Sequence, residues 1–379
     1  MKILAFTSIR SDYDLLSPLY KLLHKDTGID LKLLVSGAHL SKEFGYTKKY
    51  IEQDGYDILC EIETLIASSS IKARIKTASI LLQNAIDVVS NYQPDLILYA
   101  GDREDVMMAA LIGIYLNIPT IHFYGGDHET DGHQDTYIRH AVSKLSSVHF
   151  VSTHQHKKRL EALGEDTKNI YNIGSISLDK FKDFKNQDFR TFFKRNDIEK
   201  FAVLIYHPVD GEDVKKTFLN ILKVLKEKEI FTFVSYPNTD PNYEIIVDII
   251  QSFKGDSNFI FYKNLQRDMF LSIFSQASFI IGNSSAGIYE SATLKIPTIN
   301  VGLRQKDREA SKNVVFCKAK RKNIDKAIKK VLSQKFQKKL QRVKNIYGNG
   351  KSAQKAYRLI MTHNFRKKIP KTYDPLLKT

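Results

Sequence analysis

The sequence predicts an α/β protein made of two Rossmann-like, doubly wound domains that face a common cleft. Its 379 residues are too many for one ordinary core and suit two domains. Short apolar segments without strict alternation lie between amphipathic helical patterns, which is typical of strands buried on both faces of a parallel sheet. This pattern pauses near residues 174–196 and then resumes. We therefore expect an N-terminal domain over 1–178 and a C-terminal domain over 179–379, with the last helix packing back on the N-terminal domain.

Ten apolar segments are the predicted strands, and the clearest predicted helix spans residues 71–92. The strands of the first domain are expected at 2–8, 31–36, 96–100, 120–124 and 148–152. Those of the second domain are expected at 201–206, 231–235, 259–262, 279–282 and 298–301. Ligands of such sheets bind at the carboxyl ends of the strands, so the residues directly after each strand are the candidate site residues.

Composition narrows the class of protein. With 42% hydrophobic and 26% charged residues the chain is globular, and no apolar run approaches the ~18 residues of a membrane span. The first residues read as a strand and not as a signal peptide, so we expect a cytoplasmic protein without a membrane partner.

Cys60 and Cys317 lie in apolar stretches and are predicted to be buried, reduced thiols. With two cysteines and no CxxC or HExxH motif, no metal site is predicted.

The net charge of +16 is concentrated in residues 318–345. Apolar residues recur there at helical spacing and leave the lysines on the opposite face; they are Ile324, Ala327, Ile328, Val331 and Leu332. We interpret this segment as a helix with a solvated basic face. No aromatic interleaving or known module accompanies the charge, so nucleic acid is not an expected partner. An anionic substrate would still be attracted by the overall field.

Two loops of the first half carry candidate binding residues. Arg10 follows the first strand, where its fork of donors suits phosphate oxygens; the alternative is a surface loop in which Asp14 caps the next helix. His39 lies in the turn after the second strand, where a packed loop histidine and a ligand-binding one are equally expected.

The acid/base candidates follow the next strands. Asp102 comes directly after Gly101 at a strand end, as a helix cap or as a catalytic carboxylate. Residues 121–140 contain four carboxylates and four histidines, and crowded carboxylates raise one another's pKa toward neutrality. Asp127, Glu129 and Asp135 are therefore catalytic candidates. A solvated loop with a helix cap at Asp135 is the alternative, and the spacing fits no metal site that we recognise.

The second half carries candidates for binding an anion. His207, between a strand end and Pro208, is placed to stabilise a departing anion, or else forms a structural turn. Asn238 follows the next strand. Residues 281–290 form a small-residue turn that opens a helix, which predicts a phosphate cradle. Its candidate residues, with the arginine that follows, are Asn283, Ser284, Ser285, Gly287, Glu290 (for ribose hydroxyls) and Arg304 (for phosphate).

These segments together resemble the UDP-N-acetylglucosamine 2-epimerase family, in particular its hydrolysing branch. The matching stretches run in order along nearly the whole chain, and GNSSAGIYE followed by LKIPT is the most specific of them; they are RSDYDLL, SGAHLSKEFGYT, AGDRED, GGD with DTYIRHAVSKLSSVHF, YHPVD, YPNTD, GNSSAGIYE, LKIPTINVGLRQKDRE and YGNGKSAQK. One departure is plain, because the family usually has Glu where this chain has Asp127. Either Asp127 acts with a shorter arm or Glu129 replaces it. The non-hydrolysing branch usually has His-Arg where this chain has His207-Pro208.

The resemblance implies a glycosyltransferase-B-like fold and a nucleotide-sugar substrate. It implies that UDP-N-acetylglucosamine, or a UDP- or GDP-linked 2,4-diacetamido sugar, is converted to the free manno-configured sugar and nucleoside diphosphate. It assigns Asp102, Asp127 and Asp135 to acid/base chemistry, and it requires no cofactor. A homodimer is expected from the family likeness alone. The alternatives are a non-hydrolysing 2-epimerase, a nucleotide-sugar glycosyltransferase and a catalytically silent nucleotide-sugar binding protein.

Overall fold

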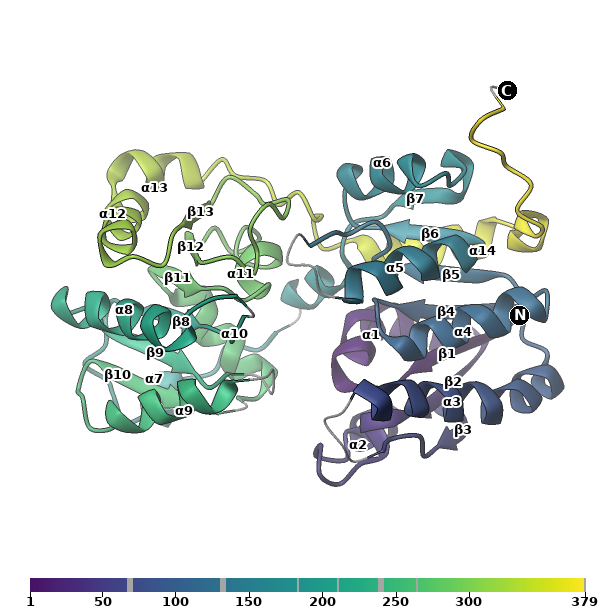
Figure 1. Cartoon of the computed structure of the whole chain (residues 1–379), viewed down its shortest axis with the longest axis horizontal. Coiled ribbons are helices and arrows are strands. Elements are labelled where there is room, and N and C mark those ends of the chain that lie inside the picture. Colours follow the sequence, from purple (N-terminus) through teal and green to yellow (C-terminus); the bar gives the residue numbers. More distant parts are fainter. Residues whose placement is uncertain are drawn as a thin grey trace. The chain divides into compact units, whose positions relative to one another are not determined.

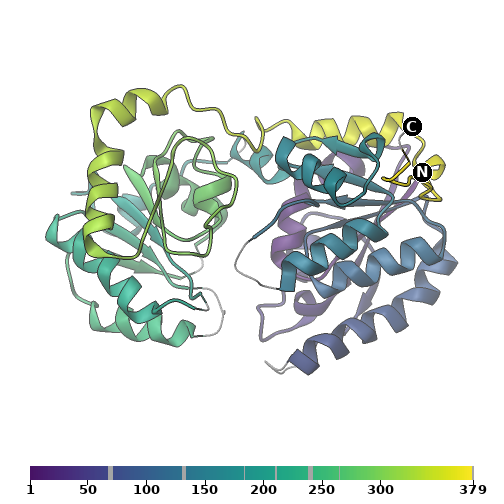
Figure 2. The same cartoon turned by 45° about the horizontal axis from the view of Figure 1, so that its top comes forward.

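The computed structural model describes residues 1–66, 71–129, 134–182, 184–209, 211–237, 242–263 and 265–377. The chain divides into two compact units (Figures 1 and 2). The first comprises Met1–His128, Gly132–Lys180 and Tyr347–Thr379, and the second comprises Glu129–Asp131 and Phe181–Ile346. The chain thus passes to the second unit after Lys180 and returns to the first at Tyr347. Among the described residues, no helix combines the length and the apolar character needed to cross a membrane.

The first unit is a seven-stranded parallel sheet in the order β3-β2-β1-β4-β5-β6-β7. Its strands are β1 (Lys2–Thr7), β2 (Asp30–Ser36), β3 (Asp57–Ile62), β4 (Leu96–Ala100), β5 (Thr120–Phe123), β6 (Val148–Val151) and β7 (Ile170–Asn172). Its helices are α1 (Arg10–His24), α2 (Lys48–Gln53), α3 (Ile71–Tyr92), α4 (Glu104–Tyr115), α5 (Gln134–Leu145), α6 (His154–Ala162) and α14 (Ser352–Thr362), with short 3-10 helices at Gly37–Leu40, Thr167–Asn169, Ile176–Lys182 and Phe365–Lys368.

Alternating side chains of β1 enter the two cores of this unit, as a strand buried on both faces requires. Ile3 and Ala5 pack with residues of α1 and α14 on one face. Leu4 and Phe6 pack with residues of α3, α4 and α5 on the other face. The helix α3 forms because Ala78, Leu81, Ala85 and Val89, spaced three or four apart, are all buried.

The second unit repeats the design with six parallel strands in the order β10-β9-β8-β11-β12-β13. Its strands are β8 (Ala202–Ile205), β9 (Thr232–Ser235), β10 (Phe259–Tyr262), β11 (Phe279–Gly282), β12 (Thr298–Val301) and β13 (Val314–Cys317). Its helices are α7 (Phe189–Phe192), α8 (Val214–Glu227), α9 (Tyr243–Ser252), α10 (Arg267–Gln276), α11 (Ala286–Tyr289), α12 (Arg321–Leu332) and α13 (Gln334–Leu340). Residues of α8, α9 and α12 cover one face, and residues of α7 and α10 cover the other.

Each sheet reverses its strand order once, next to its first strand. The reversal lies between β1 and β4 in the first unit and between β8 and β11 in the second. Doubly wound sheets bind ligands outside the carboxyl ends of the strands at this point. The loops after β1, β4, β8 and β11 are therefore the candidate ligand-binding loops of the two units.

The predicted fold class is confirmed, and three short strands are additions to it. β3, β7 and β13 were not predicted, and each lies at an edge of its sheet.

Cys60 on β3 and Cys317 on β13 are free but only half-buried, because an edge strand is open on one side; this corrects their prediction as buried thiols. Burial still raises the pKa of the Cys60 thiol to about 11. Leu332, predicted on the apolar face of its helix, is 46% exposed because it lies in the last turn of α12.

Candidate active site

Two of the acid/base candidates of the first unit are joined by a buried arginine. Asp102 follows β4, Asp127 follows β5, and Arg139 projects from α5. The Arg139 guanidinium binds Asp102 through Nη2 and lies with Nη1 at 3.0 Å from Asp127 Oδ2. Asp127 and Arg139 are only 3% and 6% exposed. Burial makes such a pairing necessary, since an uncompensated buried charge is costly. The structure thus brings two predicted carboxylates to one cation at the ends of two neighbouring strands.

The Asp127 carboxylate has further partners that fix its orientation. Its Oδ1 accepts the backbone N–H of His128 at 2.9 Å, and it lies 3.4 Å from Nε2 of His156 on α6. His156 is itself 1% exposed. A carboxylate held on both sides by rigid elements suits a group that must meet a substrate proton in one geometry.

The other two predicted carboxylates pair with different arginines. Asp135, in the first turn of α5, is 3.8 Å from Arg74, whose guanidinium binds Glu104 with two bonds of 3.0 and 2.6 Å. Burial alone would raise the pKa of Glu104, but the bonds from Arg74 hold it below its usual value. Glu129 pairs with Arg308 at 2.7 Å within the second unit. Asp127, and not Glu129, therefore shares a cation with Asp102.

The loop after β1 is held by a buried hydrogen-bond network. The Asp12 carboxylate accepts the backbone N–H groups of Ser8 and Ile9 at 2.9 and 3.2 Å. His39 is 0% exposed, and its ring nitrogens lie 2.9 Å from Thr7 Oγ1 and 2.8 Å from Thr47 Oγ1. His39 therefore holds this loop together, and its contact with substrate stays a prediction.

Arg10 of the same loop is half-exposed. It lies 3.8 Å from Asp14 and stacks on the Tyr50 ring at 4.9 Å, and Lys180 approaches Asp14 at 3.0 Å. Arg10 and Lys180, from two different segments, thus bring two cations to Asp14 near the carboxyl end of β1. This is a suitable place for an anionic group.

In the second unit, Asn283 acts on the backbone of His207. Its amide oxygen accepts the His207 N–H at 2.8 Å, and its amide nitrogen donates to the His207 carbonyl at 2.8 Å. The β11 strand comes so close to β8 that a Cβ on Gly282 would lie 2.0 Å from the Ile205 carbonyl oxygen, and Gly282 has a φ of 130°. Asn283 thus positions the His207 loop, and its predicted contact with nucleotide remains a prediction.

The predicted phosphate cradle opens only one turn of helix. The Ser284 hydroxyl accepts the backbone N–H of Ala286 at 3.3 Å, and α11 spans four residues, so its dipole is small. Gly287 is required by packing, because a Cβ there would lie 2.7 Å from Thr298 Cγ2. Ser284 and Ser285 remain partly accessible at the carboxyl end of β11.

The charged candidates near this turn also have partners. Glu290 is 3.5 Å from Arg267, and Arg304 donates to the Asn283 carbonyl at 3.4 Å. The loop that carries Arg304 is held by Glu212, which accepts the Leu303 N–H and, at 3.1 Å, the Tyr206 hydroxyl. Arg304 is thereby placed beside the end of β11.

Sequence reasoning missed several residues of these sites. Arg139 was not predicted as a site residue and appeared only within the motif that contains Asp135. The two residues are four apart and share one face of α5, and this spacing could have indicated Arg139. His156 and Glu212 carried no sequence signal, because each acts on a segment far away in the chain. Asn238, predicted as a binding residue, lies outside the described residues.

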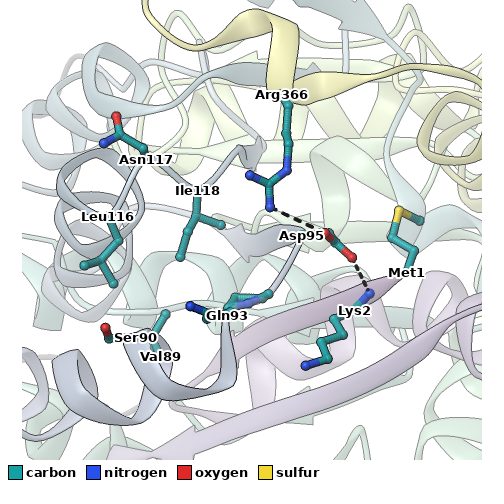
Figure 3. A pocket seen from close by; sticks show the side chains of 11 residues that line it. Met1, Lys2, Val89, Ser90, Gln93, Asp95, Leu116, Asn117, Ile118 and Arg366 are labelled. Atoms are coloured by element: carbon teal, nitrogen blue, oxygen red, sulfur yellow. Dashed lines mark hydrogen bonds and ion pairs between the residues drawn. The ribbon is translucent and has the colours of Figure 1, made fainter.

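A cavity of about 620 Å³ lies away from these loops, at the amino ends of β1 and β4 (Figure 3). Arg366 and Asp95 point toward each other there at 3.5 Å, and Asp95 also accepts the Lys2 backbone N–H at 2.9 Å (Figure 3). No predicted site residue lines this cavity. Within the described ranges, no group of three or more His, Cys, Asp and Glu side chains is placed to hold a metal ion.

Comparison with known proteins gives a consistent result. The family model described as UDP-N-acetylglucosamine 2-epimerase matches residues 21–361. The chain is 32% identical to a UDP-N,N'-diacetylbacillosamine 2-epimerase (hydrolyzing) of Legionella pneumophila, over 95% of this chain and 96% of that one. It is 33% identical to a GDP/UDP-N,N'-diacetylbacillosamine 2-epimerase (hydrolyzing) of Campylobacter jejuni, over 88% of each. Its fold matches the crystal structure of UDP-GlcNAc 2-epimerase from Neisseria meningitidis bound to UDP-GlcNAc, with a TM-score of 0.80 at 19% identity, over 96% of this chain and 100% of that one.

Proposed function

The chain belongs to the UDP-N-acetylglucosamine 2-epimerase family, and we propose that it is a hydrolysing member that acts on a nucleotide-linked 2-acetamido sugar. The products would be the free manno-configured sugar and a nucleoside diphosphate. The observation that carries the proposal is the Asp102–Arg139–Asp127 cluster at the ends of β4 and β5. The names of both hydrolysing relatives favour a UDP- or GDP-linked 2,4-diacetamido sugar as donor, ahead of UDP-N-acetylglucosamine.

Elimination accounts for epimerisation at a carbon whose proton is only weakly acidic. A carboxylate, Asp102 or Asp127, takes the C2 proton while the C1–oxygen bond breaks and its electron pair leaves with the diphosphate. The product of this step is a 1,2-unsaturated glycal. Water then adds its oxygen to C1, and a proton returns to C2 from the opposite face. The sum is one water consumed, one epimerised free sugar and one nucleoside diphosphate.

The cationic and hydroxyl groups of both units supply the electrostatic part of this proposal. Arg10 at the end of β1 and the loops of His207, Ser284, Ser285 and Arg304 at the ends of β8, β11 and β12 would stabilise the diphosphate as it departs. Asp135, 36% exposed at its side chain, would activate the water. Glu290 would hold the ribose hydroxyls.

The test is incubation of the protein in heavy water with UDP-N-acetylglucosamine and, separately, with UDP- and GDP-linked 2,4-diacetamido sugars, followed by proton and phosphorus NMR. We expect free nucleoside diphosphate and a manno-configured sugar with deuterium at C2. Deuterium in an intact nucleotide sugar would instead identify a non-hydrolysing epimerase. No reaction with any donor would overturn the epimerase proposal for these substrates and favour a glycosyltransferase or a binding protein.

A further inference from the structure

His122 occupies the point where the three segments that carry the Asp102–Arg139–Asp127 cluster meet. It lies on β5, is 0% exposed, and takes no part in the chemistry proposed above. Its neighbours in sequence, Ile121 and Phe123, pack in the core on the α1 side of the sheet. The imidazole therefore faces the side that α4 and α5 cover, where its ring lies 5.9 Å from that of Tyr99.

Both ring nitrogens of His122 are engaged by segments of the cluster. Nε2 lies 2.8 Å from the carbonyl oxygen of Gly101, the residue before Asp102. Nδ1 lies 3.1 Å from Ser143 Oγ on α5, and this hydroxyl also lies 3.0 Å from the carbonyl of Arg139, one turn earlier. One side chain thus connects the turn that carries Asp102 to the helix that carries Arg139.

The third segment is packed against the same ring. A Cβ on Gly125 would lie 3.0 Å from His122 Nδ1 and 3.0 Å from Ser143 Oγ, so the backbone there touches both groups. Asp127 follows two residues later. The imidazole therefore lies against all three segments, and any side chain at position 125 would have to displace the ring or the Ser143 hydroxyl slightly.

Chemistry decides the form of the ring. A carbonyl oxygen can only accept, so the Nε2 that faces Gly101 carries a proton. The single hydroxyl proton of Ser143 can go to the Arg139 carbonyl or to Nδ1, and a neutral ring accepts it at Nδ1. Burial lowers the pKa of His122 to about 3, which leaves the ring neutral at physiological pH. The neutral Nε2–H tautomer satisfies both contacts at once.

We propose that His122 is a positioning residue that aligns Asp102, Asp127 and Arg139 by holding the Gly101 turn, the Gly125 turn and α5 in register. The proposal rests on the proposed function, in which these carboxylates move the C2 proton. A histidine that merely fills the core would be replaceable by any side chain of similar shape. A positioning histidine is replaceable only by a side chain that again donates a hydrogen bond to the Gly101 carbonyl oxygen.

Two substitutions separate these roles. His122→Gln places an amide N–H at a reach similar to that of Nε2, whereas His122→Phe keeps the ring shape and removes both hydrogen bonds. We expect His122→Phe to lower kcat by about 10- to 100-fold, because small misplacements of catalytic groups cost that much, with KM changed less than about 3-fold. We expect His122→Gln to keep at least about one third of the wild-type kcat.

His149 provides the matched control. It lies directly opposite His122 on the neighbouring strand β6, is also 0% exposed, and bonds Glu165 at 2.9 Å, which is not one of the three cluster residues. We expect His149→Phe to lower the Tm and to leave kcat within about 3-fold of the wild type. Equal losses of kcat in His149→Phe and His122→Phe would overturn the proposal, as would a His122→Phe variant with wild-type kcat or a folded His122→Gln variant as slow as His122→Phe.

The tautomer gives a second readout that does not depend on turnover. In protein labelled with 15N-histidine, the cross-peaks lost in His122→Gln identify the ring. We expect the neutral Nε2–H tautomer from pH 8 to pH 5, and an Nδ1–H tautomer or an imidazolium would overturn the proposal even where the Phe variant fails to fold. A wild-type protein that turns over none of the donors would overturn the proposed function, and the tautomer would then still decide whether the bond to Gly101 exists.

Discussion

Arg139 is the residue on which the proposed acid/base centre depends most. Two carboxylates, Asp102 and Asp127, share its guanidinium, and Asp127 is almost completely buried. Arginine suits this place because its planar fork reaches two carboxylates at once and keeps its charge when buried. Removing it leaves two negative charges without their shared cation.

We expect Arg139→Met to lower kcat by more than about 100-fold and the free energy of unfolding by about 3 kcal/mol, the usual consequence of breaking a buried ion pair. Urea unfolding and the NMR assay of turnover measure the two effects. In the double variant Arg139→Met/Asp102→Asn, one uncompensated charge is gone. We expect it to regain at least about 1 kcal/mol without regaining activity, and strictly additive losses of stability would contradict the assigned pairing.

The choice between Asp127 and Glu129 as the catalytic carboxylate is also testable at this scale. Asp127 lies beside Arg139, whereas Glu129 pairs with Arg308. We expect Asp127→Asn to lower kcat at least about 100-fold, as for loss of a general acid or base, and Glu129→Gln to lower it less than about 10-fold. Parallel kinetics of the two variants, with solvent deuterium exchange at C2, measure this. A larger loss in Glu129→Gln would transfer the role to Glu129.

Among the elements, the loop after β12 shows how a binding group is placed. Glu212 accepts the Leu303 N–H and the Tyr206 hydroxyl, and a Cβ on Gly302 would meet its carboxylate at 2.4 Å. Arg304 follows directly. Glu212 thus joins the loops after β8 and β12 through hydrogen bonds within the protein, which form without a substrate.

We expect Glu212→Ala to weaken binding of UDP or GDP about 10-fold and to change kcat at saturation less than about 3-fold, since the Arg304 loop loses its anchor and the acid/base cluster keeps its own. Isothermal titration with the nucleoside diphosphate measures the affinity. Glu227→Ala is the control, because Glu227 forms an exposed ion pair with Arg321 in the same unit. Unchanged affinity in Glu212→Ala would show that Arg304 is not a binding residue or is placed by other contacts.

For the whole molecule, buried ionisable groups connect distant parts of the chain. Lys371, near the C-terminus, donates to the Lys144 carbonyl at 2.8 Å and to Glu165 at 2.5 Å, and Glu165 also bonds His149. Burial alone would raise the pKa of Glu165, but His149 and the lysines hold it at about 2. The end of the chain is thereby tied to the first unit, beside the last turn of α5.

The buried groups His122, His140 and Glu165 are expected to lower the stability of the protein as the pH falls. The folded pKa of His122 is about 3 and that of His140 about 4, in both cases chiefly because of burial, so the unfolded chain binds their protons first as pH falls below about 6.5. Protonation therefore favours unfolding, and Glu165 adds to this effect below about pH 4.5, since its folded pKa is the lower one.

We expect the free energy of unfolding to fall by on the order of a few kcal/mol between pH 7 and pH 5, measured by urea denaturation at each pH. His122→Gln removes one of the titrating groups, so its stability should fall less over the same interval. A wild-type stability that is constant between pH 7 and pH 5 would contradict the neutral, buried state of these histidines.

The candidate site was predictable in part, for a definite reason. Asp102, Asp127, His207 and Ser284 follow strands directly, so a parallel sheet brings them to its carboxyl edge whatever the details of packing. Asn283 and His39 were chosen by the same rule, but both have their polar atoms engaged by neighbouring segments. Position after a strand identifies the loop, and hydrogen bonding within the loop then decides which side chains remain available.

The sequence by itself determined the fold class, the span of α3 and ten of the thirteen strands found in the described part of the chain, because apolar runs buried on both faces and the helical period are local signals. It also determined the family, through motifs that are contiguous in the chain. Only the tertiary structure decided that Arg139 joins Asp102 to Asp127, that Glu212 holds the Arg304 loop, and that His122 holds Gly101. The edge strands β3, β7 and β13 also belong to this second group. The physical reason is common to all of them: each depends on a partner far away in sequence, and such a pairing exists only once the sheets have formed.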